Sequence, residues 1–254
     1  MIRIIMNGCS GRMGKVIAGL LEGDAEAKIV AGVDAYNDGS LKFPVFDSIE
    51  KCNIPGDVII DFSSPKALDA LLSYATKSYT AVVLCTTGYT SEQLDQIREA
   101  SKDVAILKSA NMSLGINTII KLLKTAADVF CESGFDVEIV ERHHNQKLDA
   151  PSGTAIALAD AINDARNGEY EYIYDRSQRR EKRDKKELGI SAVRGGTIPG
   201  THEVIFAGPD ELIEIKHVAY SRSIFGNGAI SAAKFMAGKK PGMYDMSDVI
   251  AAMV

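Results

Sequence analysis

The architecture follows from one segment near the amino terminus, Ile2-Arg3-Ile4-Ile5-Met6-Asn7-Gly8-Cys9-Ser10-Gly11-Arg12-Met13-Gly14. An apolar run typical of a buried strand leads into glycines spaced G-x-x-G-x-x-G, and helical spacing follows over Met13–Leu21. Gly8 permits a turn that a Cβ would block, and Gly11 lets the backbone approach a phosphate. Gly14 lets the helix pack closely, so that N–H groups at the helix start face the phosphates. This unit predicts a dinucleotide-binding turn of variant spacing, with a plain tight turn as the alternative.

An acid lies at the separation that such a turn predicts. Asp34 follows the apolar run Lys28–Val33, 20 residues after Gly14 (34 − 14 = 20), and about 20 is the usual separation between the glycine turn and the ribose-binding acid. A carboxylate there accepts hydrogen bonds from the adenosine ribose and repels a 2′-phosphate. The next residue is Ala35 rather than an arginine. We therefore expect NADH to be used at least as well as NADPH, with a strand-end surface acid as the alternative for Asp34.

The first half of the chain alternates short apolar runs with stretches of helical spacing. The runs are Ile2–Met6, Lys28–Val33, Asp57–Ile60, Ala81–Leu84 and Val104–Leu107, and the helical stretches are Met13–Leu21, Pro65–Lys77 and Ser91–Lys102. Continuous apolar strands separated by helices predict a parallel sheet buried on both faces, in a Rossmann-like doubly wound α/β domain. Ligands bind at the carboxyl ends of such strands. We therefore expect the turns Cys85-Thr86-Thr87-Gly88 and Ala110-Asn111-Met112-Ser113 to complete the cofactor site.

The pattern changes after Asn111. Helical spacing to about Cys131 precedes a strand pattern, a second helix and two alternating runs joined by a turn, at 135–140, 151–166, 202–207 and 212–218. We predict a second, α+β domain with a mainly antiparallel sheet over 114–220. The tail Ile224–Met236 is helical again and is expected to return to the first domain, which comprises 1–113 and 221–254.

Composition limits the classes of function. The 254 residues carry a net charge of −5, and this acidic balance argues against a nucleic-acid-binding protein. The four cysteines are far apart, which fits free thiols in a reducing cytoplasm rather than a disulfide framework or a zinc site. No apolar run approaches the roughly 20 residues that a membrane span requires. We expect a soluble cytoplasmic protein without a metal.

The segment Asp175–Glu187 is dense in charge, with seven Lys or Arg and four Asp or Glu residues. A nucleic-acid-binding patch would carry one sign of charge and interleaved aromatic residues, and this segment has neither. We therefore predict a solvated loop or helix face.

A second cluster of functional residue types occupies Glu141-Arg142-His143-His144-Asn145-Gln146-Lys147-Leu148-Asp149-Ala150-Pro151-Ser152-Gly153-Thr154. His143 and Lys147 are two kinds of proton donor near one point, which suits an anionic substrate that is protonated during the reaction. Residues 151–154 are typical of a helix start, where free N–H groups bind a carboxylate. The cluster favours function over a solvated loop. His202 and His217 stand apart in the sequence, so we do not expect a metal site.

The chain resembles the 4-hydroxy-tetrahydrodipicolinate reductase (dihydrodipicolinate reductase) family of bacterial lysine biosynthesis over nearly its whole length. The most specific motif is 141–154, and Gly8–Gly14, Thr86–Gly88, Ala110–Ser113 and Arg194–Thr197 also fall in the family's order. The resemblance implies reduction of the dihydrodipicolinate skeleton at ring C4 by hydride from NADH or NADPH, after the 4-hydroxyl group leaves as water.

The resemblance also implies a role for each matching residue. His143 would donate or accept a proton and Lys147 would be the second proton donor, while the substrate carboxylates would be held by His144, Gly153 and Thr154. The cofactor would be held by Gly8, Cys9, Ser10, Gly11, Arg12, Met13, Asp34, Cys85, Thr86, Thr87, Ala110, Asn111, Met112 and Ser113. Family members are typically homotetramers assembled through the middle sheet, which makes 114–220 the expected substrate-binding and oligomerisation domain and the remainder the dinucleotide-binding domain.

The chain departs from the family pattern at two positions. Cys85 stands where members often have Gly, so that its side chain would crowd the nicotinamide ribose while backbone contacts survive. Ala35 replaces an Arg that some members place after the acid, which argues against tight NADPH binding.

Two other functions fit the first domain. One is another two-domain Rossmann dehydrogenase acting on an amino acid or a semialdehyde, which gives no reason for His143, His144 and Lys147 to cluster. The other is a non-catalytic redox sensor that binds NADH and controls a partner, and it needs no proton donor.

Overall fold

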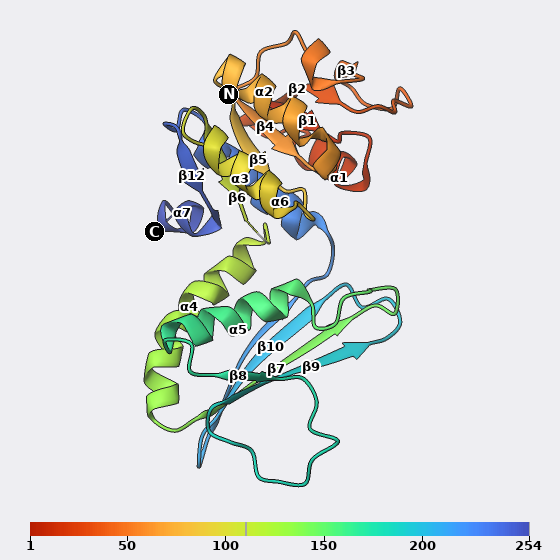
Figure 1. Ribbon diagram of the computed structural model, residues 1–254. Helices are drawn as coiled ribbons and strands as arrows, with labels where there is room; N and C mark the ends of the chain where they lie inside the picture. The colour runs from red at the N-terminus through yellow and green to blue at the C-terminus, as the bar shows by residue number, and fades with distance from the viewer. Residues whose placement is uncertain (110, 254) are drawn as a thin grey trace. The chain divides into compact units, whose positions relative to one another are not determined.

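The computed structural model describes residues 1–109 and 111–253, which form two compact units. One unit combines Met1–Leu114 with Arg222–Val254, and the other is Gly115–Ser221 (Figure 1). The chain therefore leaves the first unit and returns to it, as the helical tail led us to expect.

The first unit contains a seven-stranded sheet in the order β12-β6-β5-β4-β1-β2-β3, in which every pair of neighbours is parallel. The strands are β1 (Ile2–Asn7), β2 (Ala27–Val33), β3 (Val45–Phe46), β4 (Val58–Asp61), β5 (Ala81–Leu84), β6 (Ala105–Lys108) and β12 (Gly242–Tyr244). The helices are α1 (Arg12–Leu20), α2 (Leu68–Ser78), α3 (Ser91–Ala100), α6 (Ser223–Met236) and α7 (Met246–Ala251), with short 3-10 turns η1 (Ile49–Lys51) and η2 (Pro65–Ala67). The predicted Rossmann-like sheet is confirmed.

Helices cover both faces of this sheet because successive strand residues point to opposite sides. Ile4 and Met6 of β1 pack in one apolar cluster with residues of α6, such as Ala233, whereas Ile5 packs in another with residues of α2, such as Leu71. All five side chains are almost fully buried. Two-sided burial is why the strands read as continuous apolar runs rather than alternating ones.

The second unit contains a five-stranded mixed sheet in the order β11-β10-β7-β9-β8. Its elements are α4 (Leu114–Glu132), β7 (Asp136–His143), α5 (Gly153–Ala165), β8 (Glu171–Ile173), β9 (Glu187–Arg194), β10 (Thr201–Ala207) and β11 (Leu212–Val218). β10 pairs antiparallel with β7 and β11, while β9 pairs parallel with β7 and β8. Both helices contribute to one apolar cluster with the strands, through side chains such as Leu123 and Leu158. The predicted α+β domain is confirmed, and half of its strand pairings are antiparallel.

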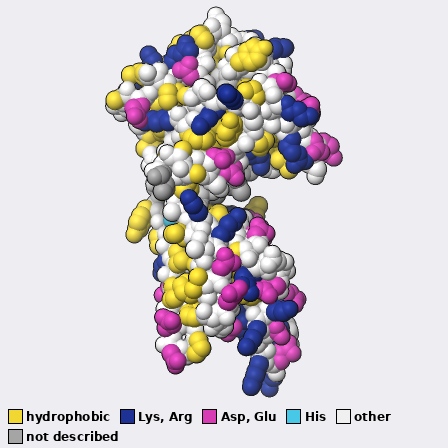
Figure 2. Space-filling model, turned by 90° about the vertical axis from the view of Figure 1, so that its left-hand side faces the viewer, with side chains coloured by type: hydrophobic (Ala, Val, Ile, Leu, Met, Phe, Trp, Pro, Cys, Tyr) yellow, Lys and Arg dark blue, Asp and Glu magenta, His cyan; other side chains and the backbone are white. Residues whose placement is uncertain are grey.

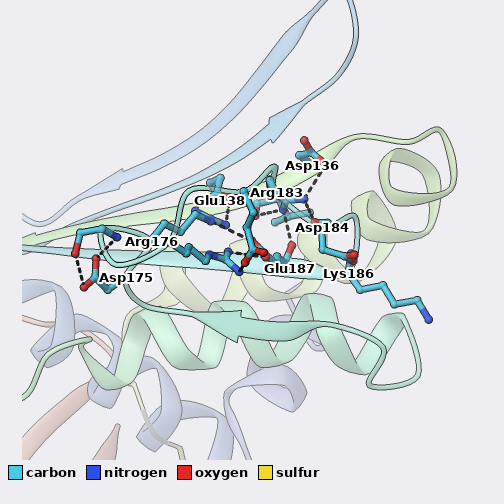
Figure 3. Close-up of polar contacts among 12 residues, drawn as sticks. Asp136, Glu138, Asp175, Arg176, Arg183, Asp184, Lys186 and Glu187 are labelled. Atoms are coloured by element: carbon cyan, nitrogen blue, oxygen red, sulfur yellow. Dashed lines mark hydrogen bonds and ion pairs between the residues drawn. The ribbon is translucent and has the colours of Figure 1, made fainter.

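Residues 175–186 of the charged segment form a loop and Glu187 begins β9, but the expectation that the charges of this segment are simply solvated is wrong for three arginines. Arg176 donates to both oxygens of Glu138 at 2.8 and 3.0 Å and to Glu187 at 3.0 Å. Arg183 donates to Glu138 at 3.0 Å, and Arg179 donates to Glu187 at 2.5 Å. These ion pairs fasten the loop to β7 and β9 (Figure 3).

The face drawn in Figure 2 carries charged side chains of both signs. On this face, Lys and Arg side chains lie among Asp and Glu side chains. Across 1–109 and 111–253, no helix is both long and apolar enough to cross a bilayer.

Candidate active site

The glycine-rich turn between β1 and α1 has the close packing that requires glycine. Gly8 has φ +81°, and a Cβ there would lie 2.5 Å from the carbonyl oxygen of Phe62. A Cβ on Gly14 would lie 2.4 Å from the carbonyl oxygens of both Gly8 and Cys9. Gly11 is the N-cap residue of α1, and no side chain caps the helix. The first N–H groups of α1 are therefore not taken by a capping side chain, which is the arrangement that binds a phosphate.

A pocket of about 520 Å³ lies over this turn, within the size range of small-ligand sites. Of the predicted cofactor residues, Gly8, Gly11 and Asp34 line it. The other lining residues are Asn7, Val33, Ala35, Asp47, Ser48, Ile49, Phe62, Ser63, Ser64, Ala67 and Ala70. A glycine cradle, an uncapped helix start and a strand-end carboxylate fit a dinucleotide.

The remaining predicted residues of the turn, Cys9, Ser10, Arg12 and Met13, do not line the pocket. Cys9 is fully buried in the apolar core. A Cβ on Gly32 would lie only 2.6 Å from the Cys9 Sγ atom, so this thiol faces the core.

The Asp34 carboxylate ties the turn to the end of β2. Its Oδ2 atom accepts a hydrogen bond from the Ser10 N–H at 3.0 Å, and its Oδ1 atom accepts one from the Tyr36 N–H at 3.1 Å. Each oxygen has further acceptor capacity. Asp34 therefore shapes the loop and faces the pocket at the same time.

The two later turns follow β5 and β6, as the sequence led us to expect. Burial, and then the charge of Asp61, raise the pKa of the Cys85 thiol well above its ordinary value. Thr86 is buried and Thr87 is exposed. Asn111 accepts a hydrogen bond from the Ser113 N–H at 2.8 Å, and Met112 is buried. Ala110 lies outside the described residues, and none of the other residues in these turns lines the pocket over Gly8.

In the second unit, His143 ends β7 on the face that also carries Val137, Ile139 and Glu141. The His143 Nδ1 atom lies 2.7 Å from Oε2 of Glu141, a fully buried carboxylate. Arg194, which is paired with His143 in the β7–β9 register, donates to both Glu141 oxygens at 2.7 Å. The Ser152 N–H donates to Oε1 at 2.9 Å. The strand register therefore assembles a histidine, a carboxylate and a guanidinium in one buried network.

Glu141 is ionised in this network. Burial opposes the charge and is the largest single effect on its pKa. Hydrogen bonds from Arg194, His143 and the Ser152 N–H outweigh it and hold the pKa of Glu141 below its ordinary value.

His202, which stands alone in the sequence, lies beside His143 in the structure. The two rings are 5.1 Å apart, edge to face. The His202 Nε2 atom is 2.8 Å from the Ser152 Oγ atom, which also accepts from the Ala155 N–H and so caps α5. Burial, with a smaller effect from His143, lowers the pKa of His202 to about 4, so this ring is neutral at pH 7.

The other residues predicted for the substrate lie where β7 leads into α5. Lys147 forms an ion pair of 2.7 Å with Asp149, and this bond lowers the pKa of the Asp149 carboxyl. Gly153 and Thr154 begin α5, and a Cβ on Gly153 would meet no atom within 4 Å. His144 is half-buried. In the described part of the chain, no group of three His, Cys, Asp or Glu side chains is arranged to hold a metal ion.

Sequence reasoning gave no role to Glu141, Ser152, Arg194 or His202. Glu141 and Arg194 lie within motifs that carry the family resemblance, but 53 residues separate them. The strand alternation of β7 was the available signal, because it places an acid on the face of Val137 and Ile139.

Fold and site together define a class, the two-domain proteins that combine a Rossmann-like unit with an α+β unit. A probable dehydrogenase from Thermotoga maritima shares this fold, with a TM-score of 0.60, 15% identity and coverage of 99% of this chain and 93% of that one.

Family models assign the chain to one family within this class. A model of the dihydrodipicolinate reductase N-terminus matches residues 2–112, and a model of the C-terminus of the same family matches 115–250. This chain belongs to the dihydrodipicolinate reductase family, as the resemblance implied, and is an NAD(P)H-dependent oxidoreductase.

Two relatives named 4-hydroxy-tetrahydrodipicolinate reductase match this chain over nearly its full length. The 4-hydroxy-tetrahydrodipicolinate reductase of Caldanaerobacter subterraneus is 52% identical, and that of Clostridium novyi is 50% identical, each over 98% of both chains. A dipicolinate-bound dihydrodipicolinate reductase from Paenisporosarcina sp. TG-14 is 25% identical, with a TM-score of 0.80 over 96% of this chain and 97% of that one.

Proposed function

We propose that this chain reduces the dihydrodipicolinate skeleton, formed from 4-hydroxy-tetrahydrodipicolinate by loss of water, to tetrahydrodipicolinate in lysine and diaminopimelate biosynthesis. The observation that carries the proposal is the match to both family models, over 2–112 and 115–250. NADH or NADPH, when bound, supplies the hydride.

The second unit provides the side chains that donate protons to the substrate. Hydride addition to a conjugated imine drives negative charge toward the ring nitrogen, and a positioned acid that protonates it contributes about 10²–10⁴-fold. We assign this role to His143, with Lys147 as the second proton donor.

The substrate carboxylates are assigned to His144, Gly153 and Thr154. The open space above Gly153 lets an oxygen approach the first N–H groups of α5, where the helix dipole favours negative charge. The Paenisporosarcina relative is described with dipicolinate, a small aromatic dicarboxylate, and the substrate proposed here is of the same class.

The first unit holds the cofactor through Asp34 and the residues of three turns: Gly8, Cys9, Ser10, Gly11, Arg12, Met13, Cys85, Thr86, Thr87, Ala110, Asn111, Met112 and Ser113. Asp34 accepts hydrogen bonds from the ribose hydroxyls and repels a 2′-phosphate, so NADH is used at least as well as NADPH. Since Cys9 faces the core, its contribution is through the backbone.

We further propose a cytoplasmic homotetramer that assembles through the sheet of the second unit, the substrate-binding and oligomerisation domain. Three large apolar side chains are exposed on the sheet's strands: Val193 on β9 at 44%, and Leu212 and Val218 on β11 at 57% and 40%. All three are candidates for burial against another subunit.

The test is NADH oxidation with substrate freshly generated from pyruvate and aspartate semialdehyde. The wild-type protein is expected to consume NADH only when both precursors and the synthase that condenses them are present. The variant His143→Gln is expected to lower kcat by about 10²–10⁴-fold, because it lacks the proton donor, while cofactor binding persists. No turnover by the wild-type protein rejects the proposed function, and an unchanged kcat in the variant removes His143 from the chemistry.

A further inference from the structure

We propose that Glu141 is a positioning residue that holds His143 in the tautomer with its proton on Nδ1, so that Nε2 is the atom that exchanges a proton with the substrate. The inference deepens the proposed function and rests on it for the chemistry. The tautomer itself is a property of the protein alone and is tested without substrate.

The contact between the two residues is built into the strand. Glu141 and His143 are two positions apart on β7, so their side chains leave the same face of the sheet. The imidazole Nδ1 atom and the carboxylate Oε2 atom lie 2.7 Å apart, a short hydrogen-bond distance. An ionised carboxylate only accepts hydrogen bonds, so the proton of this bond is on Nδ1.

The carboxylate is itself fixed. Arg194 donates one hydrogen bond to each oxygen at 2.7 Å, and the Ser152 N–H adds a third at 2.9 Å. Arg194 also donates to the carbonyl oxygens of Val193 and Asp149, at 2.8 and 2.6 Å. Rotation of the Glu141 carboxylate would break several of these bonds at once. Glu141 therefore presents a rigid acceptor to His143.

The other sides of the ring are also confined. A Cβ on Gly200 would lie 3.0 Å from the His143 Nε2 atom, so glycine at this position leaves the ring its space. The His202 ring packs edge to face on His143 and is held by the Ser152 Oγ atom. Ser152 thus links His143, through Glu141 and through His202, to the start of α5.

The test uses ¹⁵N-labelled protein and the variant Glu141→Gln, which keeps the side-chain volume but turns one acceptor into a donor. Long-range ¹H–¹⁵N spectra of the wild-type protein above pH 8 are expected to show His143 only as the Nδ1–H tautomer, and the variant is expected to show a mixture. In the reductase assay, kcat of the variant is expected to fall by about 10²-fold with little change in KM, because the acid is misplaced rather than substrate binding lost.

Glu187→Gln is the matched control. Glu187 (Figure 3) is also a buried carboxylate held by two arginines, Arg176 and Arg179, but among the described contacts it pairs with neither His143 nor Arg194. It begins β9, at the opposite end of that strand from Arg194. This variant is expected to keep the wild-type His143 tautomer and kcat.

A wild-type tautomer and a wild-type kcat in Glu141→Gln would overturn the inference. Should that variant not fold, Arg194→Lys replaces it, since lysine lacks the planar fork that donates in parallel to both carboxylate oxygens; the same mixture of tautomers is expected, and its absence overturns the inference. If the wild-type protein fails to turn over the substrate, the proposed function is rejected, while the spectra still decide the role of Glu141.

Discussion

At the scale of the residue, the structure gives Asp34 two tasks. Its carboxylate accepts from the Ser10 and Tyr36 N–H groups and also faces the pocket over Gly8. The sequence predicts the second task from spacing alone. The first depends on how the loop folds back onto the end of β2, which no local pattern records.

Replacement of Asp34 by Ala is expected to weaken NADH binding about tenfold or more, because the ribose loses its acceptor. NADPH binding is expected to be spared, since the repulsion of its 2′-phosphate is relieved at the same time. Fluorescence titration with each cofactor measures both dissociation constants. Equal weakening of the two would contradict the ribose assignment and would show that the loop contacts alone had been lost.

His202 predicts a pH dependence of stability. Its pKa is about 4 in the folded protein, below the ordinary value of 6.5, because burial disfavours the charged ring. The unfolded chain therefore binds a proton that the folded one does not between these values, and the stabilisation present above pH 6.5 is lost as the pH falls toward 4. The variant His202→Gln lacks this group, so its melting temperature is expected to fall less than that of the wild-type protein between pH 7 and pH 5. Parallel declines would contradict the assignment.

At the scale of the element, the sequence predicts the strands best where burial is two-sided. β1, β2, β4, β5 and β6 all appear as apolar runs. β9 was missed because a charged stretch precedes it and its exposed end carries weak alternation. β3 and β12 have only two and three residues, which is too short for a recognisable side-chain pattern. They are strands because they pair with β2 and β6.

Helix α1 contains two glycines, Gly14 and Gly19, and only at Gly14 does the packing exclude a larger side chain. A Cβ on Gly14 would lie 2.4 Å from two carbonyl oxygens, whereas a Cβ on Gly19 would meet nothing within 4 Å. Gly14→Ala is expected to lower the free energy of unfolding by about 1–3 kcal/mol, because the turn and helix must separate. Gly19→Ala, the control in the same helix, is expected to raise it by about 0.5–1 kcal/mol. Urea unfolding measures both, and a stable Gly14→Ala variant would contradict the packing described for the turn.

At the scale of the whole molecule, the first unit is built from two segments that are separated in the sequence by the second unit. The match to the C-terminal family model covers 115–250, yet residues from Arg222 onward belong to the first unit, where α6 packs on the sheet beside α1. The helical spacing of 224–236 was enough to predict that return.

The network of side chains around Glu141 is the part that the sequence predicts least. The segment 141–154 points to His143 and Lys147 because two of the chain's four histidines lie there, with a lysine four residues after the first. Arg194 and His202 join this network only through strand pairing. Arg194 of β9 is paired with His143 of β7, 51 residues earlier (194 − 143 = 51), and His202 of β10 is paired with Glu141 of β7, 61 residues earlier (202 − 141 = 61). Long-range strand pairing, and not local composition, decides which side chains meet Glu141.

In the proposed reaction, hydride passes from the nicotinamide to ring C4 of the dehydrated substrate. The most direct measurement uses NADH carrying deuterium at both C4 positions, with NMR of the tetrahydrodipicolinate formed. We expect one deuterium at ring C4 of the product for each NADH consumed. Deuterium at another carbon, or NADH consumed without deuterium in the product, would contradict it.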